Sequence, residues 1–169
     1  MKSLEVITVG NGSKEYPGNF TKKEIHLIKD ICKDKYALHL FSGKSTIGDV
    51  RVDFTQPEAT HKGDVFEFLE TYKGPHFNIV ILDPPYNSRF ADKYQKLGDT
   101  PSQFVIFANS KKTTILLNLI RETIQPDIII MKSWNYYIPK GYTDVGSYLC
   151  YAGGYRKSTI LMICRRVKL

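Results

Sequence analysis

The sequence predicts an α/β fold with a mostly parallel central sheet, helices on both of its faces and an antiparallel hairpin at its C-terminal edge. Between residues 21 and 131, short apolar runs alternate with segments of helical period, a pattern typical of parallel strands joined by helices. The last 25 residues instead hold two apolar runs that meet at Gly153 and Gly154. Because no helix separates these two runs, they indicate an antiparallel pair.

The first half of the chain predicts two helices and three strands. Residues 10–21 are rich in glycine, proline and asparagine and are typical of a loop. Thr21 and Glu24 have the spacing of a capping box, which predicts a helix that continues to about residue 33. Its apolar face would carry Ile25, Ile28 and Cys32. The other expected elements are strands at residues 36–41, 50–54 and 77–82, and a helix at residues 64–72 with Val65, Phe68 and Leu69 facing inward.

The second half predicts one further helix and three strands. Residues 111–123 have the period of an amphipathic helix, which Pro126 separates from an apolar strand at residues 127–131. The closing hairpin would pair residues 145–151 with residues 158–164. Ligands on such sheets bind beyond the carboxyl ends of the strands. We therefore expect the chemistry of this protein at the ends of the strands 36–41 and 77–82.

Length and composition indicate one globular domain over residues 1–169, without a separate target-recognition domain. The 169 residues are 42% hydrophobic and 24% charged, which excludes a disordered chain. No apolar run reaches the roughly 18–20 residues that span a bilayer. The first residues are not followed by the apolar core of a signal peptide, so we expect a cytoplasmic protein.

Cysteine spacing and charge bear on metals and partners. Cys32, Cys150 and Cys164 are far apart and form no C-x-x-C pair, so we expect neither a metal site nor a disulfide framework. The formal net charge is +7. A basic surface attracts polyanions, which favours a nucleic-acid partner, and the alternative is a soluble protein that is merely basic. We expect no membrane partner.

The sequence Asp83-Pro84-Pro85-Tyr86 directly follows the expected strand 77–82. Two prolines stiffen the backbone and remove two N–H donors, so the loop presents acceptors, namely the Asp83 carboxylate and the Pro84 carbonyl. Two acceptors that hold the N–H groups of a planar amino group would free its lone pair for attack. Asp83 would also accept the departing proton. Tyr86 would stack on a base, an interaction worth about 1–3 kcal/mol.

Residues 79–87, from Ile79 through the Asp-Pro-Pro-Tyr sequence to Asn87, resemble the catalytic motif of the S-adenosylmethionine-dependent amino-methyltransferases. That family includes the N6-adenine and N4-cytosine DNA methyltransferases, and some guanine-N2 RNA methyltransferases carry the same four residues. The resemblance implies a Rossmann-like methyltransferase fold. It also implies transfer of a methyl group from S-adenosyl-L-methionine to an exocyclic amino nitrogen of a nucleic-acid base, with DNA favoured over RNA.

The same resemblance implies a cofactor site upstream of this motif. Phe41-Ser42-Gly43 is similar to the Phe-x-Gly cofactor loop of the family, and glycine lets the backbone approach a ligand closely. Asp53 ends the next apolar strand and would accept hydrogen bonds from the ribose hydroxyls, as strand-end acids do in dinucleotide folds. The acid of Gly63-Asp64-Val65-Phe66 would accept the adenine amino group, with Val65 or Phe66 beside the ring. A turn or helix-cap role remains the alternative for Asp53 and Asp64.

One departure from the family pattern concerns the connection between these two strands. Phe41 and Asp53 are only 12 positions apart, whereas a parallel crossover that contains a helix needs a dozen or more residues. We therefore expect either a helix reduced to a turn or an unusual cofactor loop. Residues 14–21 lie where the family often places a segment over the methionine end of the cofactor.

Candidate substrate-binding residues follow two of the expected strands. Asn87 and Arg89 open a polar, basic stretch after the Asp-Pro-Pro-Tyr loop, and Trp134 begins an aromatic cluster after the strand 127–131. Aromatic rings at a strand end would line the pocket of a flipped base. Packing in the core is the alternative for the neighbouring tyrosines.

Three other functions are open to this sequence. A nucleotide triphosphatase is disfavoured, because Gly43-Lys44-Ser45-Thr46 lacks the earlier glycine of a phosphate-binding loop and position 38 is leucine. A nucleic-acid-binding protein that has lost its cofactor is supported only by the short connection before Asp53. The third alternative keeps the chemistry and changes the acceptor to an RNA base, a glutamine or a small-molecule amine.

Overall fold

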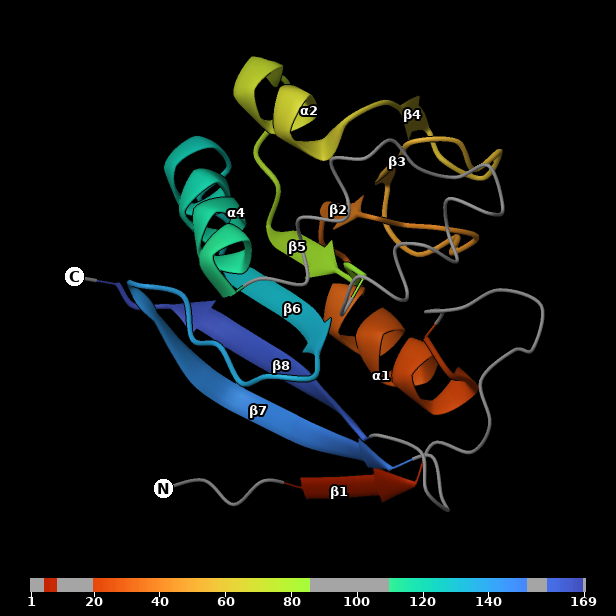
Figure 1. The fold of residues 1–169 in the computed structure, drawn as a ribbon, viewed down its shortest axis with the longest axis vertical. Helices are drawn as coiled ribbons and strands as arrows, with labels where there is room; N and C mark the ends of the chain where they lie inside the picture. The colour runs from red at the N-terminus through yellow and green to blue at the C-terminus, as the bar shows by residue number, and fades with distance from the viewer. Residues whose placement is uncertain (1–4, 9–19, 86–109, 152–157, 169) are drawn as a thin grey trace.

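The computed structural model describes residues 5–8, 20–85, 110–151 and 158–168. Eight strands in these ranges form one sheet with the order β1-β7-β8-β6-β5-β2-β3-β4 (Figure 1). The strands are β1 (Glu5–Thr8), β2 (Ala37–Leu40), β3 (Val50–Asp53), β4 (His61–Lys62), β5 (Ile79–Leu82), β6 (Ile128–Ser133), β7 (Tyr142–Tyr151) and β8 (Thr159–Arg166).

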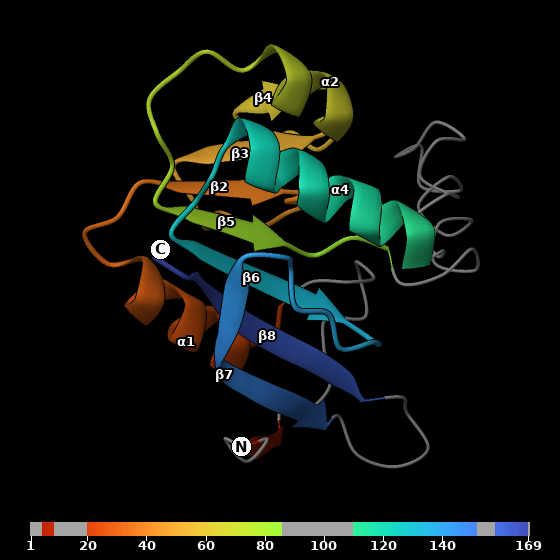
Figure 2. The ribbon, with the colours of Figure 1, turned by 90° about the vertical axis from the view of Figure 1, so that its left-hand side faces the viewer.

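Seven of the described strands run in the same direction, and β8 runs against them. The arrowheads of β5, β6 and β7 therefore point to the same edge of the sheet (Figure 2). The chain leaves β2 outward through β3 and β4, and then returns to place β5 on the other side of β2. This reversal makes the fold Rossmann-like, and sheets of this kind bind their ligands outside the strand ends at such a point, here the carboxyl ends of β2 and β5.

Helix α1 (Lys22–Cys32) covers one face of the sheet. The capping box is formed as expected, since Thr21 accepts a hydrogen bond from the Glu24 backbone and the Glu24 carboxylate accepts one from the Thr21 N–H at 2.6 Å. The core on this side contains Phe20, Ile28, Ile47, Ile81 and Ile130 among other apolar residues. Alternate residues of β5 and β6 thus face α1.

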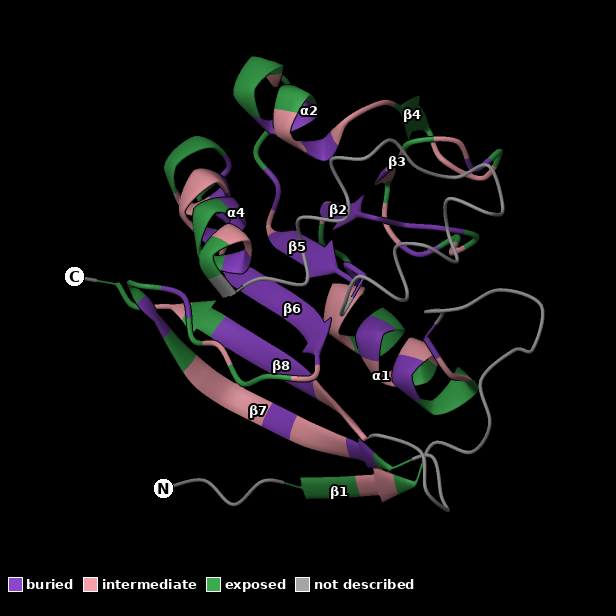
Figure 3. Ribbon diagram, in the orientation of Figure 1, coloured by how far each residue is buried: buried purple, intermediate pink, exposed green. Residues whose placement is uncertain are grey.

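Helices α2 (Val65–Thr71) and α4 (Ser110–Thr123) cover the opposite face (Figures 1 and 3). Val65, Phe68 and Leu69 are buried against the sheet, as the periodicity predicts. Leu82 of β5 and Met131 of β6 belong to the same core cluster. With helices on both faces of a mostly parallel sheet, the predicted fold class is confirmed. Among the described residues, every helix is too short or too polar to span a bilayer.

The connection between β2 and β3 contains no helix, so the expected reduction to a turn is confirmed. Asp49 returns the chain to the start of β2, since its backbone N–H donates to the Ala37 carbonyl and its Oδ2 accepts from the Ala37 N–H, both at 2.8 Å. Ile47 fills part of the core that a crossover helix would otherwise cover. Gly48 adopts a φ of +95° to close the turn.

The structure contains two strands that the sequence did not predict, β1 and β4, and it places the start of β7 earlier than predicted. The strands β1 and β4 lie at the two edges of the sheet and had no clear apolar pattern, because β1 is mostly exposed and β4 is only His61 and Lys62. The predicted start of β7 at residue 145 was wrong by three residues, since pairing with Arg166 begins at Tyr142. The antiparallel hairpin is present, with β8 between β6 and β7 and with β1 paired outside β7.

Candidate active site

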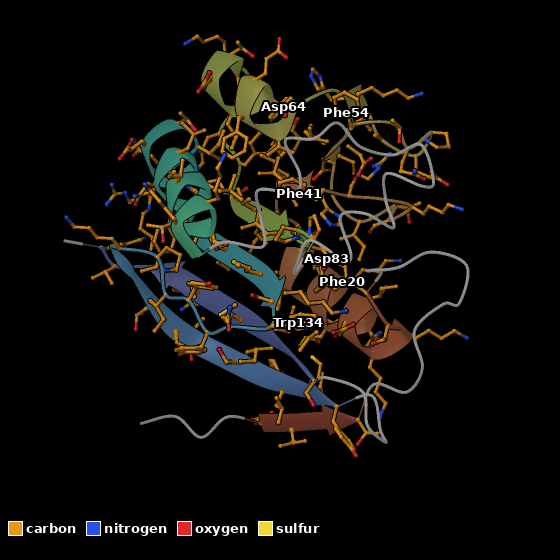
Figure 4. All side chains as sticks on the ribbon, in the orientation of Figure 1. Phe20, Phe41, Phe54, Asp64, Asp83 and Trp134 are labelled. Carbon is orange, nitrogen blue, oxygen red and sulfur yellow. The ribbon has the colours of Figure 1, made fainter. Side chains whose placement is uncertain are left out.

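The carboxyl edge of the sheet gathers most of the candidate residues. Phe41, Asp53 and Asp83 directly follow or end β2, β3 and β5, which are neighbours in the sheet. Asp64 follows β4, and Trp134 follows β6. Figure 4 labels Phe41, Asp64, Asp83 and Trp134 along the same side of the sheet. The candidates that the sequence placed at strand ends therefore lie along the edge of the sheet where the strand order reverses.

Asp83, Pro84 and Pro85 are buried at the end of β5, and Asp83 is only 9% exposed. Burial shields the carboxylate from water and strengthens its interaction with any group placed against it. The two prolines supply no N–H, so the backbone here offers carbonyl acceptors alone. Tyr86, Asn87 and Arg89 lie outside the described residues.

The Phe41-Ser42-Gly43 turn follows β2, beside the Asp83 loop. Phe41 and Gly43 have φ angles of +58° and +53°, a conformation that is uncommon for a residue with a side chain such as Phe41. The Ser42 N–H donates to the Val52 carbonyl at 3.1 Å, which fixes the turn against β3. The Ser42 hydroxyl is buried and has no hydrogen-bond partner among the described residues. A buried polar group of this kind is usually satisfied by a water or a ligand.

Asp53 joins the ends of β2 and β3. Its Oδ2 accepts from the Gly43 N–H at 2.8 Å, and its Oδ1 accepts from the N–H groups of Thr55 and Gln56 at 3.3 Å. The carboxylate is thus the turn anchor that the alternative interpretation expected. A carboxylate can accept several hydrogen bonds at once, so holding the turn is compatible with contact to a ligand.

Asp64 is the N-cap of α2, the role expected as its alternative. Its Oδ1 accepts from the Phe66 and Glu67 N–H groups at 2.8 and 3.2 Å, and neither bond uses Oδ2. Val65 is 1% exposed and belongs to the core cluster with α4. Phe66 is half-buried beside it. Of this group, Asp64 and Phe66 retain exposed side-chain surface at the sheet edge.

Phe54 is a candidate that the sequence analysis did not single out. It follows Asp53 directly and is 37% exposed, although it is a large apolar ring. An aromatic residue next to a strand-end acid was a usable signal, but the apolar run 50–54 made Phe54 look like part of the strand. Trp134 is half-buried at the end of β6.

A buried polar cluster lies beneath the site on the α1 face. Lys132 Nζ is 3.0 Å from Glu24 Oε2 and 5.3 Å from the centre of the Phe20 ring. His39 is fully buried beside Phe20, with ring centres 5.7 Å apart, and its Nδ1 lies 3.1 Å from the Ile47 carbonyl oxygen. Burial lowers the pKa of His39 to about 4, so its ring is neutral near pH 7. No local sequence pattern predicts this cluster, because its members are far apart in the chain.

Two hollows lie between α1 and the β2–β3 connection. One, of about 570 Å³, is near the amino end of β2, and the other, of about 210 Å³, is nearer the carboxyl edge. Both are lined by Lys29, Thr46 and Ile47, so they are neighbours along the position that a crossover helix would fill, and the two hollows together are called the channel below. Within the described ranges, no three His, Cys, Asp or Glu side chains are grouped so that they could hold a metal ion.

Comparisons with known proteins bear on the fold only. No family model matches the chain, and no curated protein matches it. Among solved structures, it is similar to a candidate methylase of Haemophilus influenzae, HI0767, with 12% identity and a TM-score of 0.47. It is also similar to a candidate methyltransferase of Escherichia coli, yhhF, with 11% identity and a TM-score of 0.48. Each match covers 98% of this chain and 99% of the other. The assignment of the fold rests on the strand order and pairing described above.

Proposed function

We propose that this protein is an S-adenosylmethionine-dependent methyltransferase that acts on an exocyclic amino nitrogen of a nucleic-acid base. One observation carries the proposal: Asp83-Pro84-Pro85 lies at the end of β5, next to the Phe41-Ser42-Gly43 turn at the end of β2. The two segments flank the point where the strand order reverses, which is where Rossmann-like sheets bind their ligands.

The residues around this point fit the cofactor. The buried Ser42 hydroxyl, unpartnered among the described residues, offers a polar contact, and the Gly43 backbone permits close approach. Asp53 would accept a ribose hydroxyl, and Asp64 would accept the adenine amino group through Oδ2. Phe54 would cover the adenine ring.

S-adenosyl-L-methionine, when bound, supplies a methyl group on a positively charged sulfur. Asp83 and the Pro84 carbonyl hold the two N–H groups of the acceptor, so that its lone pair faces that methyl carbon. Formation of the N–C bond would be balanced by breaking of the bond between the methyl carbon and sulfur, whose electron pair would stay on sulfur. The surplus proton on nitrogen passes to Asp83 or through it to water.

Several features favour a nucleic acid as the acceptor. The net charge is +7, and the channel beside the β2–β3 connection is lined by Lys29, Lys33, Lys35 and Lys44. Phosphate groups are attracted by such a surface. Trp134 at the end of β6 offers a stacking surface for a base. The order of motifs favours DNA, with adenine N6 or cytosine N4 as the acceptor, over an RNA base.

Titration with S-adenosylmethionine by calorimetry tests the cofactor part of the proposal. We expect saturable binding at micromolar concentrations, weakened at least tenfold by Asp53→Ala because one ribose contact and the Gly43 bond are lost. Asp49→Ala is the matched control, since Asp49 also bonds the backbone of this connection but lies at the opposite edge. If the folded wild-type protein bound no cofactor, it would be a nucleic-acid-binding protein on a degenerate fold.

A further inference from the structure

Lys132 is a buried cation at the end of β6, close to the Asp83 loop. It is 6% exposed, and its neighbours include the Glu24 carboxylate and the face of the Phe20 ring. A lysine is rarely buried without a specific partner or role. The Glu24 carboxylate takes part in the capping box of α1 by accepting a hydrogen bond from the Thr21 N–H. This bond does not need a cation, so the capping box does not explain why Lys132 is buried beside Glu24.

The paired residues of β5 and β6 end one position before Asp83 and Lys132. Leu82 of β5 pairs with Met131 of β6, so the next residues along the two strands are Asp83 and Lys132, on backbones about 5 Å apart. Ile81 and Ile130 face α1, whereas Leu82 and Met131 face α2 and α4. By the same alternation, Asp83 and Lys132 return to the α1 face. The contact of Lys132 with Glu24 on α1 agrees with this direction.

We infer that Lys132 is a positioning residue for Asp83, a role that rests on the function proposed above. Its ammonium group, held from behind by Glu24 and Phe20, favours the ionised form of the Asp83 carboxylate and directs it as a hydrogen-bond acceptor. An acceptor is what the amino group of the substrate requires, whereas a protonated Asp83 would present a competing donor. Glu24 in turn keeps Lys132 in place and connects it to the start of α1.

The other buried titratable groups described on this face, His39 and Cys150, are uncharged near neutral pH. His39 on β2 is neutral because burial lowers its pKa to about 4. Cys150 on β7 is a thiol, because burial and the nearby Glu24 raise its pKa to about 12. Among the buried residues described on this face, Lys132 therefore supplies the positive charge and Glu24 the second negative one. Lys29 and Lys44 also lie on this face, but they are exposed to solvent, which screens their charge.

The test is a pH titration of the Asp83 carboxyl carbon followed by NMR, in the wild-type protein and in two variants. The Asp83 resonance is identified as the one that is missing from the spectrum of Asp83→Ala. Lys132→Met removes the cation, so the midpoint should rise by about 1–3 pH units. Glu24→Gln removes the competing anion but keeps the capping box, so the midpoint should fall. A merely structural role predicts no such opposite shifts. If Lys132→Met does not fold, Glu24→Gln alone decides, and an unchanged midpoint would overturn the inference.

The acid limb of the pH–rate profile for methyl transfer supplies the second readout. In Lys132→Met this limb should move to higher pH by the same amount, with KM for the cofactor unchanged, and Lys132→Arg should restore the wild-type limb. Opposite midpoint shifts without any methyl transfer by wild type would sustain the role of Lys132 and reject the proposed reaction. Normal methyl transfer by wild type, together with an Asp83 midpoint that is the same in wild type and both variants, would sustain the proposed reaction and reject the role of Lys132.

Discussion

Phe54 presents an aromatic ring beside the strand-end acid Asp53 and is 37% exposed. Such a ring is suited to stack on the adenine of the cofactor, and stacking of this kind contributes about 1–3 kcal/mol. We predict that Phe54→Ala weakens the binding of S-adenosylmethionine about tenfold or more, measured by calorimetry. Tyr151→Ala is the control, because Tyr151 is also exposed at a strand end. It ends β7, which is separated from β3 by four strands in the sheet. Equal affinities in both variants would remove Phe54 from the site.

His39 gives the protein a specific dependence of stability on pH. Burial lowers its pKa from 6.5 to about 4, so between these values the unfolded chain binds a proton that the folded protein does not. Stability is therefore complete above about pH 6.5 and falls as the pH decreases towards 4, by about 3 kcal/mol in total.

Urea unfolding at a series of pH values measures this effect. Carboxylates also contribute to acid unfolding, so the informative quantity is the difference between wild type and His39→Leu, which has a similar volume and no titrating ring. The variant should lose the part of the slope between pH 4 and 6.5. Identical slopes would show that His39 is protonated within the folded protein.

The sequence identified Asp53 and Asp64 as candidate residues, but it did not distinguish a role in cofactor binding from a role in a turn or helix cap. Asp53 and Asp64 were expected either to bind the cofactor or to cap the chain, and the structure shows that both bond backbone N–H groups. Lys132 and Glu24 are 108 positions apart, so no local pattern predicted their pairing. Distant pairs of this kind are defined by packing and not by periodicity.

At the scale of elements, the helix-free connection from β2 to β3 is the most unusual part of the fold. Gly48 closes it with a φ of +95°, and a Cβ there would lie 3.2 Å from His39 Cβ and 3.3 Å from the Ala37 carbonyl oxygen. We predict that Gly48→Ala lowers the free energy of unfolding by about 2–3 kcal/mol, because backbone strain and crowding add.

Gly141 provides the matched control for this prediction. Its φ is +81°, but a Cβ there would meet no atom within 4 Å, so Gly141→Ala should cost only the backbone strain of about 1 kcal/mol. Urea unfolding of both variants compares the two costs. A Gly48→Ala variant as stable as Gly141→Ala would mean that the connection has room to shift.

Elements with a strong local signal were the ones that the sequence predicted. The capping box of Thr21 and Glu24 defined the start of α1, and the apolar period defined the inward face of α2. The strands β1 and β4 were missed, because each lies at a sheet edge and His61-Lys62 contains no apolar residue. Edge strands are formed by pairing with a neighbour, which a local pattern does not record.

At the scale of the whole molecule, lysine side chains gather along the channel beside α1, where a polyanion would be attracted. The charged residues that line it are Lys29, Lys33, Lys35, Lys44, Asp34 and Asp49. Of these, Lys44 lies next to the Gly43 turn. We predict that Lys29→Glu and Lys44→Glu each weaken nucleic-acid binding and lower the slope of log affinity against log salt by about 1. Fluorescence anisotropy at several salt concentrations measures both quantities.

Lys73→Glu is the control for this prediction, since Lys73 is an exposed lysine that follows α2 on the opposite face. It makes the same change in net charge without altering the channel. Equal losses in all three variants would mean that the nucleic acid responds to net charge and not to this surface. Affinity for S-adenosylmethionine should be the same in all of them.

The strand order is what turns separate motifs into one site. Residues 41–43 and 83–85 are about 40 positions apart, yet the parallel pairing of β2 with β5 places them side by side at one edge. The sequence predicted both segments and the edge on which they lie. The pairing itself depends on long-range contacts, so the neighbours of Asp83 across the sheet became visible only in the structure.

Transfer of a labelled methyl group from S-adenosylmethionine to DNA and to RNA, followed by analysis of the nucleosides, tests the central claim most directly. Wild-type protein should label an exocyclic amino nitrogen, adenine N6 or cytosine N4 of DNA in the first place. Asp83→Ala should reduce the rate at least about 100-fold while it still binds the cofactor, because it removes the acceptor for the reacting amino group. Full methyl transfer by Asp83→Ala, or no transfer by a wild-type protein that binds the cofactor, would contradict the account.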